Sequence, residues 1–429
     1  MRWPAVRSRL PRFARGGISQ IMTGSVAGQG LVFLSYPVLA RLYDPTDFGL
    51  LVVFTSIVSM VGVLSTASLE AAVLIPVSDD EATAVAWASL TAVAVTATAT
   101  AVLGATVGDA VAGFLGAPEL ADLWWLVGLT VLTLGVYLVM SEWMVRRRSY
   151  AALGRRNLLQ GIGQVVSQVG LGAAGVRPVG LLVGLGFGRL LGTGGMVSRG
   201  GLFREPPPRL AAVLAAVGRY RRFPLIASWS KLLNTAGLQV PLLVLSAVYG
   251  SAAVGLLGRV VRVVGGPTGV VAQAVYQVFT GEAGARVRGP DRDLEAFVTR
   301  YVRRLLAVGT GPALLLVLFG PSAFVWVFGP EWAESGRFAQ LLAVAYLAEF
   351  CVVPITQTLF LLEHQGLQLA WDSTRLALTA GGAALCGVLG APMTTAVALL
   401  AATHVTAYAT LYVITVRSAR RYDRAMQDR

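Results

Sequence analysis

Five basic residues lie inside long apolar stretches of the chain: Arg189, Lys231, Arg259, Arg262 and Arg375. If these stretches cross a bilayer, each charge near its centre costs about 2.5–3.5 kcal/mol on insertion scales. Each cation must therefore pair with an acid, meet water or reach an interface. The planar donor fork of arginine suits a phosphate group. The pattern favours a polar, net-positive central cavity that binds an anionic substrate.

Acidic residues share these stretches and are candidates for coupling transport to protons or sodium: Glu70, Glu349 and Asp372. Asp372 and Arg375 are three residues apart, so they can pair directly on one helix. Structural pairing or packing is the alternative role for all three acids. The bases outnumber the acids, which keeps the expected cavity positive.

Amide side chains extend the candidate substrate site: Asn234, Gln160, Gln164, Gln273 and Gln277. Gln273 and Gln277 lie on the helix face that also carries Arg259 and Arg262, and Asn234 shares a face with Lys231. Interhelical hydrogen bonding between packed helices is the alternative, and it is typical of amides inside membranes.

The composition indicates the elements that position these residues. The chain has 429 residues, of which 55% are hydrophobic and 13% charged, and its mean hydropathy is +0.68. A soluble domain carries about 25% charged residues. We therefore predict an all-α integral membrane protein with about 12 transmembrane helices, each about 20 apolar residues long. The predicted ranges are 17–40, 48–76, 82–107, 123–145, 157–175, 178–198, 224–248, 252–280, 303–328, 337–362, 367–389 and 393–416.

The distribution of basic residues predicts the orientation. With the N-terminus inside, the inner segments hold 27 of the 35 basic residues and the outer loops hold three: Arg41, Arg177 and Arg337. Cytoplasmic loops are enriched in Lys and Arg, so both termini are expected to be cytoplasmic. The net charge of +13 is explained in this way and does not indicate nucleic acid as a partner.

Two pairs of short matches suggest an internal repeat. Tyr43 and Tyr249 each begin a Tyr-x5-Gly-Leu-Leu segment, and Pro118 and Pro330 each begin a Pro-Glu-x-Ala segment. Six predicted helices separate the partners, so the two halves would have the same orientation, as in transporters with parallel repeats. Chance similarity is the alternative. The predicted divisions are a basic N-terminus (1–16), two pseudo-symmetric six-helix bundles (17–198 and 224–416), a cytoplasmic linker (199–223) and a basic tail (417–429).

Other classes of protein are not favoured. The two cysteines, Cys351 and Cys386, lie in apolar runs, and His364 and His404 are the only histidines, so neither a disulfide scaffold nor a metal site is expected. The chain has no Gly-rich phosphate loop, HExxH motif or nucleophile elbow. We expect no catalytic residues, no cofactor and no enzymatic activity; a membrane glycan-assembly enzyme is the rival from another class.

Several segments together resemble bacterial polysaccharide flippases of the O-antigen and exopolysaccharide type. In the first half these are Pro37–Gly49 (PVLARLYDPTDFG), Leu69–Pro76 (LEAAVLIP) and the acidic Ser78–Ala82. In the second half they are Phe223-Pro224, Leu233-Asn234, Val240-Pro241, Gly250-Ser251 and Gln273–Phe279. The chain departs from the pattern at Ser68-Leu69, where relatives often have an aromatic or basic residue before the glutamate.

That family lies within the multidrug/oligosaccharidyl-lipid/polysaccharide exporter superfamily. The resemblance implies two six-helix bundles in the bacterial inner membrane that flip polyprenyl-diphosphate-linked oligosaccharide by alternating access. It also implies that cationic cavity residues hold the diphosphate, and that membrane lipids and other polysaccharide-assembly proteins are partners. The rival within transport is a multidrug or small-metabolite antiporter of the same superfamily, which would favour cationic substrates and an acidic cavity.

Overall fold

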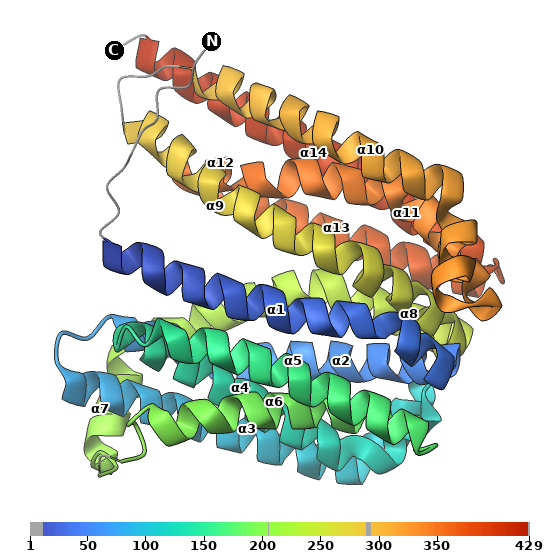
Figure 1. Cartoon of the computed structure of the whole chain (residues 1–429). Helices are drawn as coiled ribbons and strands as arrows, with labels where there is room; N and C mark the ends of the chain where they lie inside the picture. The colour runs from blue at the N-terminus through green and yellow to red at the C-terminus, as the bar shows by residue number, and fades with distance from the viewer. Residues whose placement is uncertain (1–11, 205, 289–292, 428–429) are drawn as a thin grey trace. The chain divides into compact units, whose positions relative to one another are not determined.

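The protein is described by a computed structural model that covers residues 12–204, 206–288 and 293–427, and the regular structure of these residues is entirely helical (Figure 1). The α-helices are α1 (Arg12–Leu42), α2 (Pro45–Ser65), α3 (Asp79–Phe114), α4 (Trp124–Arg146), α5 (Tyr150–Ala173), α6 (Val179–Arg199), α7 (Leu210–Arg219), α8 (Ser228–Val260), α9 (Gly266–Arg288), α10 (Leu294–Phe328), α11 (Ala333–Val352), α12 (Gln357–Leu361), α13 (Gln365–Val388) and α14 (Met393–Gln427). Short 3-10 helices are η1 (Leu69–Leu74), η2 (Pro118–Leu123), η5 (Pro330–Trp332) and η6 (Val353–Thr356), and π-helical turns are η3 (Phe223–Ala227) and η4 (Val261–Gly265).

The predicted all-helical class is confirmed. The predicted range 48–76 is not one helix, because α2 ends at Ser65, residues 66–68 form a turn and only the short η1 follows. Eight helical segments of the described chain are long and apolar enough to cross a membrane. One of them, Phe223–Val287, contains two of the predicted ranges. The number of twelve crossings and the cytoplasmic position of both termini stay predictions.

Two compact units make up the chain. Unit 1 comprises residues 1–42, 57–109 and 120–232, and unit 2 comprises residues 43–56, 110–119 and 233–429. Each has its own apolar core: one cluster in unit 1 includes Trp143 and Met140, and one in unit 2 includes Phe279 and Phe297. The predicted divisions of the chain stay predictions, and the N-terminal segment 1–16 lies mostly outside the described residues.

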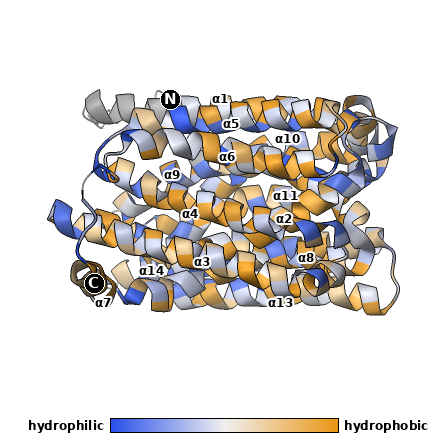
Figure 2. Cartoon of the chain, turned by 90° about the horizontal axis from the view of Figure 1, so that it is seen from below, coloured by the Kyte–Doolittle hydropathy of each residue, from blue (hydrophilic) through white to orange (hydrophobic). Residues whose placement is uncertain are grey.

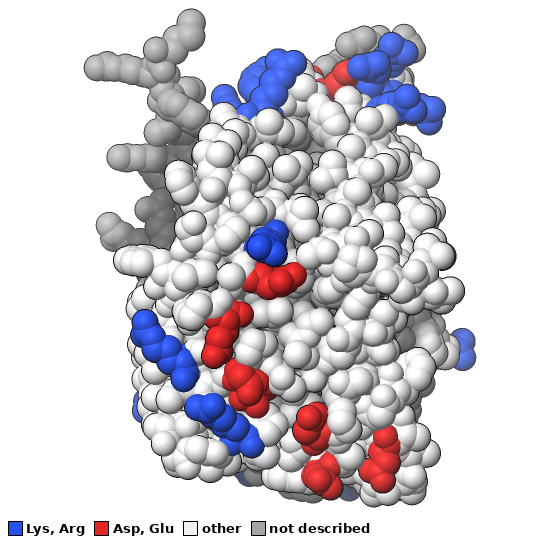
Figure 3. Space-filling view, turned by 90° about the vertical axis from the view of Figure 1, so that its right-hand side faces the viewer, with Lys and Arg blue, Asp and Glu red and all other residues white. Residues whose placement is uncertain are grey.

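Apolar residues extend along the helices, and hydrophilic residues concentrate near the helix ends (Figure 2). Many apolar side chains of α3 and α10 are exposed, for example Val95, Leu103 and Leu315. Such surfaces suit hydrocarbon, because a helix satisfies its own backbone hydrogen bonds and needs no water along its length. The helix ends that face the viewer in Figure 3 carry prominent acidic side chains.

In unit 1, helix α5 packs against both α1 and α6 (Figure 1). Glycines allow the backbones of α1 and α5 to touch: a Cβ added at Gly24 would lie 2.0 Å from the Gly154 carbonyl oxygen, and one at Gly28 would lie 2.3 Å from that of Asn157. Gly24 and Gly28 form a G-x-x-x-G spacing, which permits close helix approach inside membranes.

In unit 2, the beginning of α2 packs closely against α8. Two helices meet within α8 at Gly250, which has φ 82° and ψ 169°, a conformation that essentially only glycine adopts. A Cβ added at Gly49 would lie 1.7 Å from the Ser251 carbonyl oxygen, and one at Gly255 would lie 1.9 Å from that of Pro45. These glycines bring the segment after Tyr43 against the second helix of α8.

The glycine contact in unit 1 predicts a difference between two neighbouring positions of α1. Gly28→Ala should lower stability by about 1–3 kcal/mol, because its methyl group meets the backbone of α5 rather than a side chain that could move. Gly30→Ala is the matched control, since the space around Gly30 is open. Thermal unfolding of the detergent-purified protein measures both, and equal melting temperatures for the two variants would contradict the contact.

Candidate functional site

Glu70 is placed by an unusual turn at the end of α2. Ala67 and Ser68 have φ of 51° and 54°, a left-handed conformation that costs non-glycine residues free energy. The chain then enters η1, and the Glu70 side chain is buried. Its Oε2 accepts a hydrogen bond from Thr66 Oγ1 at 2.5 Å, and its Oε1 accepts one from Lys231 Nζ at 2.6 Å.

Lys231 therefore has a partner, although its side chain keeps 44% of its surface exposed while that of Glu70 keeps only 9%. The π-helical turn η3 precedes it, and Ser228 Oγ donates a hydrogen bond to Ser68 Oγ at 3.2 Å. This contact holds the beginning of α8 against η1. Asn234, one turn further along α8, is exposed.

Arg259 is fully buried, with no exposed surface. Its guanidinium carbon lies 3.7 Å from the ring centroid of Phe48, 4.0 Å from that of Trp332 and 5.2 Å from that of Phe328. Ring faces attract a cation, more strongly when water is excluded. The side chain thus joins the beginning of α2 to η5 and the end of α10 within unit 2. A bound substrate has no access to it in this structure.

Arg262 and Arg189 are half-buried. Arg262, in the π-helical turn η4, donates from Nη2 to Thr55 Oγ1 at 3.3 Å. That partner is an uncharged hydroxyl, and no carboxylate of the described residues forms an ion pair with Arg262. π-helical turns often occur at functional sites.

Arg375 lies in a buried polar cluster of unit 2. Its Nη2 lies 3.4 Å from Asp372 Oδ1, which confirms the ion pair predicted from the spacing of these residues. The guanidinium lies over the Trp371 ring and interacts with Tyr408, His404 and Glu349. Two of the three candidate coupling acids are therefore close to one cation.

The amides divide into two groups. Gln164 is buried and donates weakly to Gln168, whose own amide donates to the Leu181 carbonyl at 2.8 Å. Gln160 lies against Gly188 and Gly192 of α6. The geometry of these two amides favours the packing alternative. Gln273 and Gln277 are exposed on α9, and Gln273 lines a cavity together with Tyr276 and Glu349.

Sequence reasoning missed Arg156 and the tyrosines of unit 2. Arg156 lies between the predicted ranges 123–145 and 157–175, but it is buried on α5 with its guanidinium carbon 3.4 Å from the Tyr137 ring centroid. Tyr346 of α11 lines the same cavity as Glu349, and the ring of Tyr408 on α14 packs against that of Trp371, 5.5 Å between centroids. A tyrosine inside an apolar run is an unremarkable feature in a single sequence, so no sequence signal distinguished these two.

A family model for polysaccharide biosynthesis proteins matches residues 38–337, well over half of the chain. The chain belongs to this family. The succinoglycan biosynthesis transport protein ExoT of Rhizobium meliloti (strain 1021) is 27% identical over 374 residues, which cover 84% of this chain and 71% of that protein. These findings confirm the predicted relationship to bacterial polysaccharide flippases.

Solved structures show the same fold. The lipid II flippase MurJ, in an inward closed conformation, matches with a TM-score of 0.70 at 9% identity, over 97% of this chain and 90% of that one. An inward-facing multidrug resistance MATE family transporter of the MOP superfamily matches with a TM-score of 0.67 at 14% identity, over 96% and 99% of the two chains. At these identities the likeness concerns the fold alone.

Together these observations describe a multi-pass transporter-family protein of the bacterial inner membrane that functions in polysaccharide biosynthesis. Its relative is named as a transport protein, which is consistent with the expectation that it is not an enzyme.

The Glu70–Lys231 contact predicts energetic coupling between the two residues. In a double-mutant cycle with Glu70→Gln and Lys231→Ala, the coupling free energy should be about 1 kcal/mol, because Lys231 is half-exposed and water weakens the pair. Thermal unfolding of the four proteins in one detergent gives the cycle. Asn234→Ala replaces Lys231→Ala in the control cycle, and strictly additive effects of Glu70→Gln and Lys231→Ala would argue against the pair.

Proposed function

We propose that the protein flips a polyprenyl-diphosphate-linked oligosaccharide, the repeat unit of a polysaccharide, from the inner to the outer leaflet by alternating access. Membership of the polysaccharide biosynthesis family supports the substrate class. The observation that carries the proposal is Arg262. This cation lies in an apolar segment, is partly exposed, and has an uncharged hydrogen-bond partner.

A partly exposed arginine whose hydrogen-bond partner is uncharged suits a phosphate group. The guanidinium group can bind two phosphate oxygens at once while it keeps its charge. Removing it from water costs free energy that a bound anion offsets. In unit 1, Lys231 is a separate candidate for an anion contact, since nearly half of its side chain is exposed beside Glu70. The amides Asn234, Gln273 and Gln277 are exposed and suit the hydroxyl groups of sugars.

The remaining candidate cations have other environments. Arg375 is paired with Asp372, and Arg259 is enclosed by aromatic rings. We therefore assign the substrate contacts first to Lys231 and Arg262, with Arg189 as a further candidate. Arg259 and Arg375 are assigned to holding helices of unit 2 together in the conformation described.

Coupling to protons or sodium is assigned to Glu70, Glu349 and Asp372. Each lies beside a cation, so a change in its charge alters the free energy of that contact. An acid that exchanges a cationic partner for a proton or a sodium ion can bias one conformation over another.

A multidrug or small-metabolite antiporter is the second candidate, because the fold is shared with a MATE family transporter. Such a protein should favour cationic substrates. The cations at Lys231 and Arg262 oppose this alternative, since they would repel a cationic substrate.

The transport proposal is tested with a fluorescent prenyl-diphosphate sugar in proteoliposomes. Arg262→Ala should lower the flipping rate at least about tenfold. Arg262→Lys should retain part of the flipping rate, because lysine keeps the charge but cannot form a bidentate contact with phosphate. Arg337→Ala is the control, since Arg337 is an exposed arginine near the beginning of α11. Full activity of Arg262→Ala would refute the assignment, and absence of flipping by the unaltered protein would refute the function.

The coupling proposal is tested with an imposed pH or sodium gradient across the same vesicles. If Glu349 exchanges ions, Glu349→Gln should abolish the acceleration caused by the gradient, since an amide neither titrates nor balances a sodium ion. Glu282→Gln, at an exposed glutamate of α9, is the matched control. Equal gradient dependence in all three proteins would exclude Glu349.

A further inference from the structure

A groove of about 750 Å³ lies between the beginning of α10 and the end of α14, two helices that pack against each other in unit 2 (Figure 1). Four arginines line it: Arg300 and Arg303 lie about one turn apart on α10, and Arg420 and Arg424 lie about one turn apart on α14. All four residues are exposed. Two helices thus present guanidinium groups to the same space.

The acids that line the groove have partners of their own. The carboxylate oxygens of Asp423 accept hydrogen bonds from the first two backbone N–H groups of α10, at 3.2 and 2.9 Å, and this residue is only 7% exposed. Glu295 accepts hydrogen bonds from both Nε and Nη2 of Arg420, at 2.6–3.0 Å. Asp293 lies 3.4 Å from Nε of Arg286. These contacts hold the two helix ends together and offset the negative charge of the acids.

The other three arginines of the groove keep an uncompensated charge. None of the ion pairs in the described part of unit 2 involves Arg300, Arg303 or Arg424. Their positive charges repel one another, so an anion that contacts all three stabilises the groove. A phosphate group suits this arrangement, because it has several oxygens and the guanidinium fork binds two of them at once.

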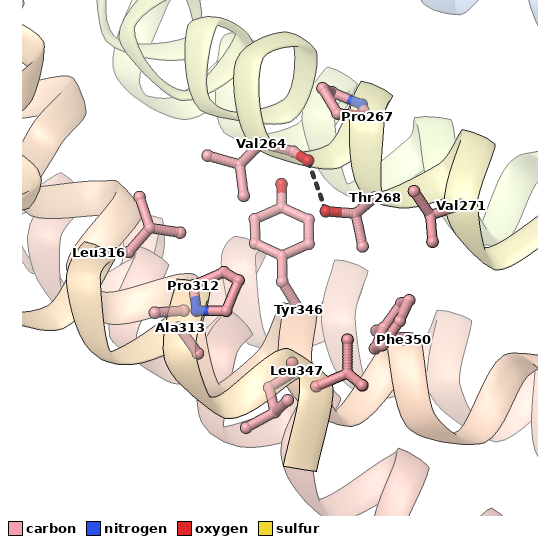
Figure 4. A pocket seen from close by; sticks show the side chains of 13 residues that line it. Val264, Pro267, Thr268, Val271, Pro312, Ala313, Leu316, Tyr346, Leu347 and Phe350 are labelled. Carbon is pink, nitrogen blue, oxygen red and sulfur yellow. Dashed lines mark hydrogen bonds between the residues drawn. The ribbon is translucent and has the colours of Figure 1, made fainter. Parts of the chain in front are cut away.

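The groove lies where both helices become apolar. On α10, the exposed Val308 follows Arg303 by five residues, and Pro312 and Leu316 beyond it line an apolar cavity (Figure 4). On α14, the exposed Val413 lies about two turns before Arg420. Each helix has 35 residues, or about 52 Å, whereas the hydrocarbon core is about 30 Å thick. Their basic ends therefore reach the level of the lipid headgroups.

We propose that this groove binds the phosphate of an anionic bilayer phospholipid, with Arg300, Arg303 and Arg424 around the phosphate oxygens and the acyl chains along the exposed apolar surface of α10. The level of the groove favours a lipid over a soluble phosphate. Basic pockets between membrane helices on the cytoplasmic side bind lipid phosphates, and the basic residues predict this end of both helices to be cytoplasmic. A zwitterionic lipid is disfavoured, because the arginines repel the cation beside its phosphate. The proposal does not depend on the proposed function, since binding requires no transport.

The experiment titrates the full chain in detergent with phosphatidylglycerol or phosphatidylcholine, and native mass spectrometry measures the lipid-bound fraction. We expect phosphatidylglycerol to bind at least about tenfold more tightly. The variant Arg300→Ala/Arg303→Ala/Arg424→Ala should lose about tenfold in affinity for phosphatidylglycerol.

The matched control removes three exposed arginines from the same two helix ends that do not line the groove: Arg304→Ala/Arg417→Ala/Arg421→Ala. Its affinity should change by less than about twofold, because the groove is intact. Equal losses of affinity in the two triple variants would reduce the effect to general surface charge and overturn the proposal. Equal affinities of the unaltered protein for the two lipids overturn it as well.

A further variant keeps every arginine in place. Ala296→Glu, at an exposed position of α10 that lines the groove, adds a carboxylate that competes with the phosphate for the arginines. It should also lower the affinity for phosphatidylglycerol. An unchanged affinity in both this variant and the groove triple variant shows that the lipid binds elsewhere and refutes the proposal.

Inorganic phosphate distinguishes a lipid from a soluble ligand. Added at the molar concentration of the lipid, it should leave the bound fraction of phosphatidylglycerol unchanged, because it lacks the acyl chains that hold a headgroup beside α10. Displacement of phosphatidylglycerol by inorganic phosphate would make the ligand a soluble phosphate and overturn the assignment to a lipid.

Discussion

The cost of holding charge in an apolar medium is the constraint on which the rest of the structure depends. Four of the five candidate cations meet this cost in three ways. Lys231 pairs with Glu70, Arg375 pairs with Asp372, Arg259 is enclosed by three rings, and Arg262 contacts a hydroxyl. Each solution joins separate helices or turns, except the Asp372 pair within α13. The charges thus help to determine which helices pack together.

The helices could be predicted from the sequence because apolar length and basic loops are local signals. The pairing of Asp372 with Arg375 was also local, and it was predicted correctly. The partner of Lys231 was not, since Glu70 lies 161 positions away and reaches it only after the left-handed turn at Ala67 and Ser68. A single sequence contains no signal for the left-handed turn or for the long-range ion pair.

Arg259 shows most clearly that a single sequence does not predict the surroundings of a residue. In the sequence it shares a face with Arg262, three residues away, and the two look equivalent. In the structure Arg259 is fully buried among three rings from two distant segments, and Arg262 is half-buried. Helix periodicity predicts which residues share a face, but the neighbouring elements decide what that face meets. The same holds for Gln160 and Gln164, which face glycines of α6.

The joint at Gly250 has a mechanical consequence. A loop of several residues has many rotatable bonds and absorbs the displacement of either helix that it connects. A single residue has two soft torsions. The helix before Gly250 is therefore linked tightly to the one after it, and Gly49 and Pro45 of α2 contact the backbone of that second helix at Ser251 and Gly255. Within unit 2, a shift of the helix between Pro241 and Gly250 is therefore passed to the helix after Gly250, and through its contacts to the segment that carries Phe48. Gly250 therefore acts as a short joint that transmits movement between the two helices of α8.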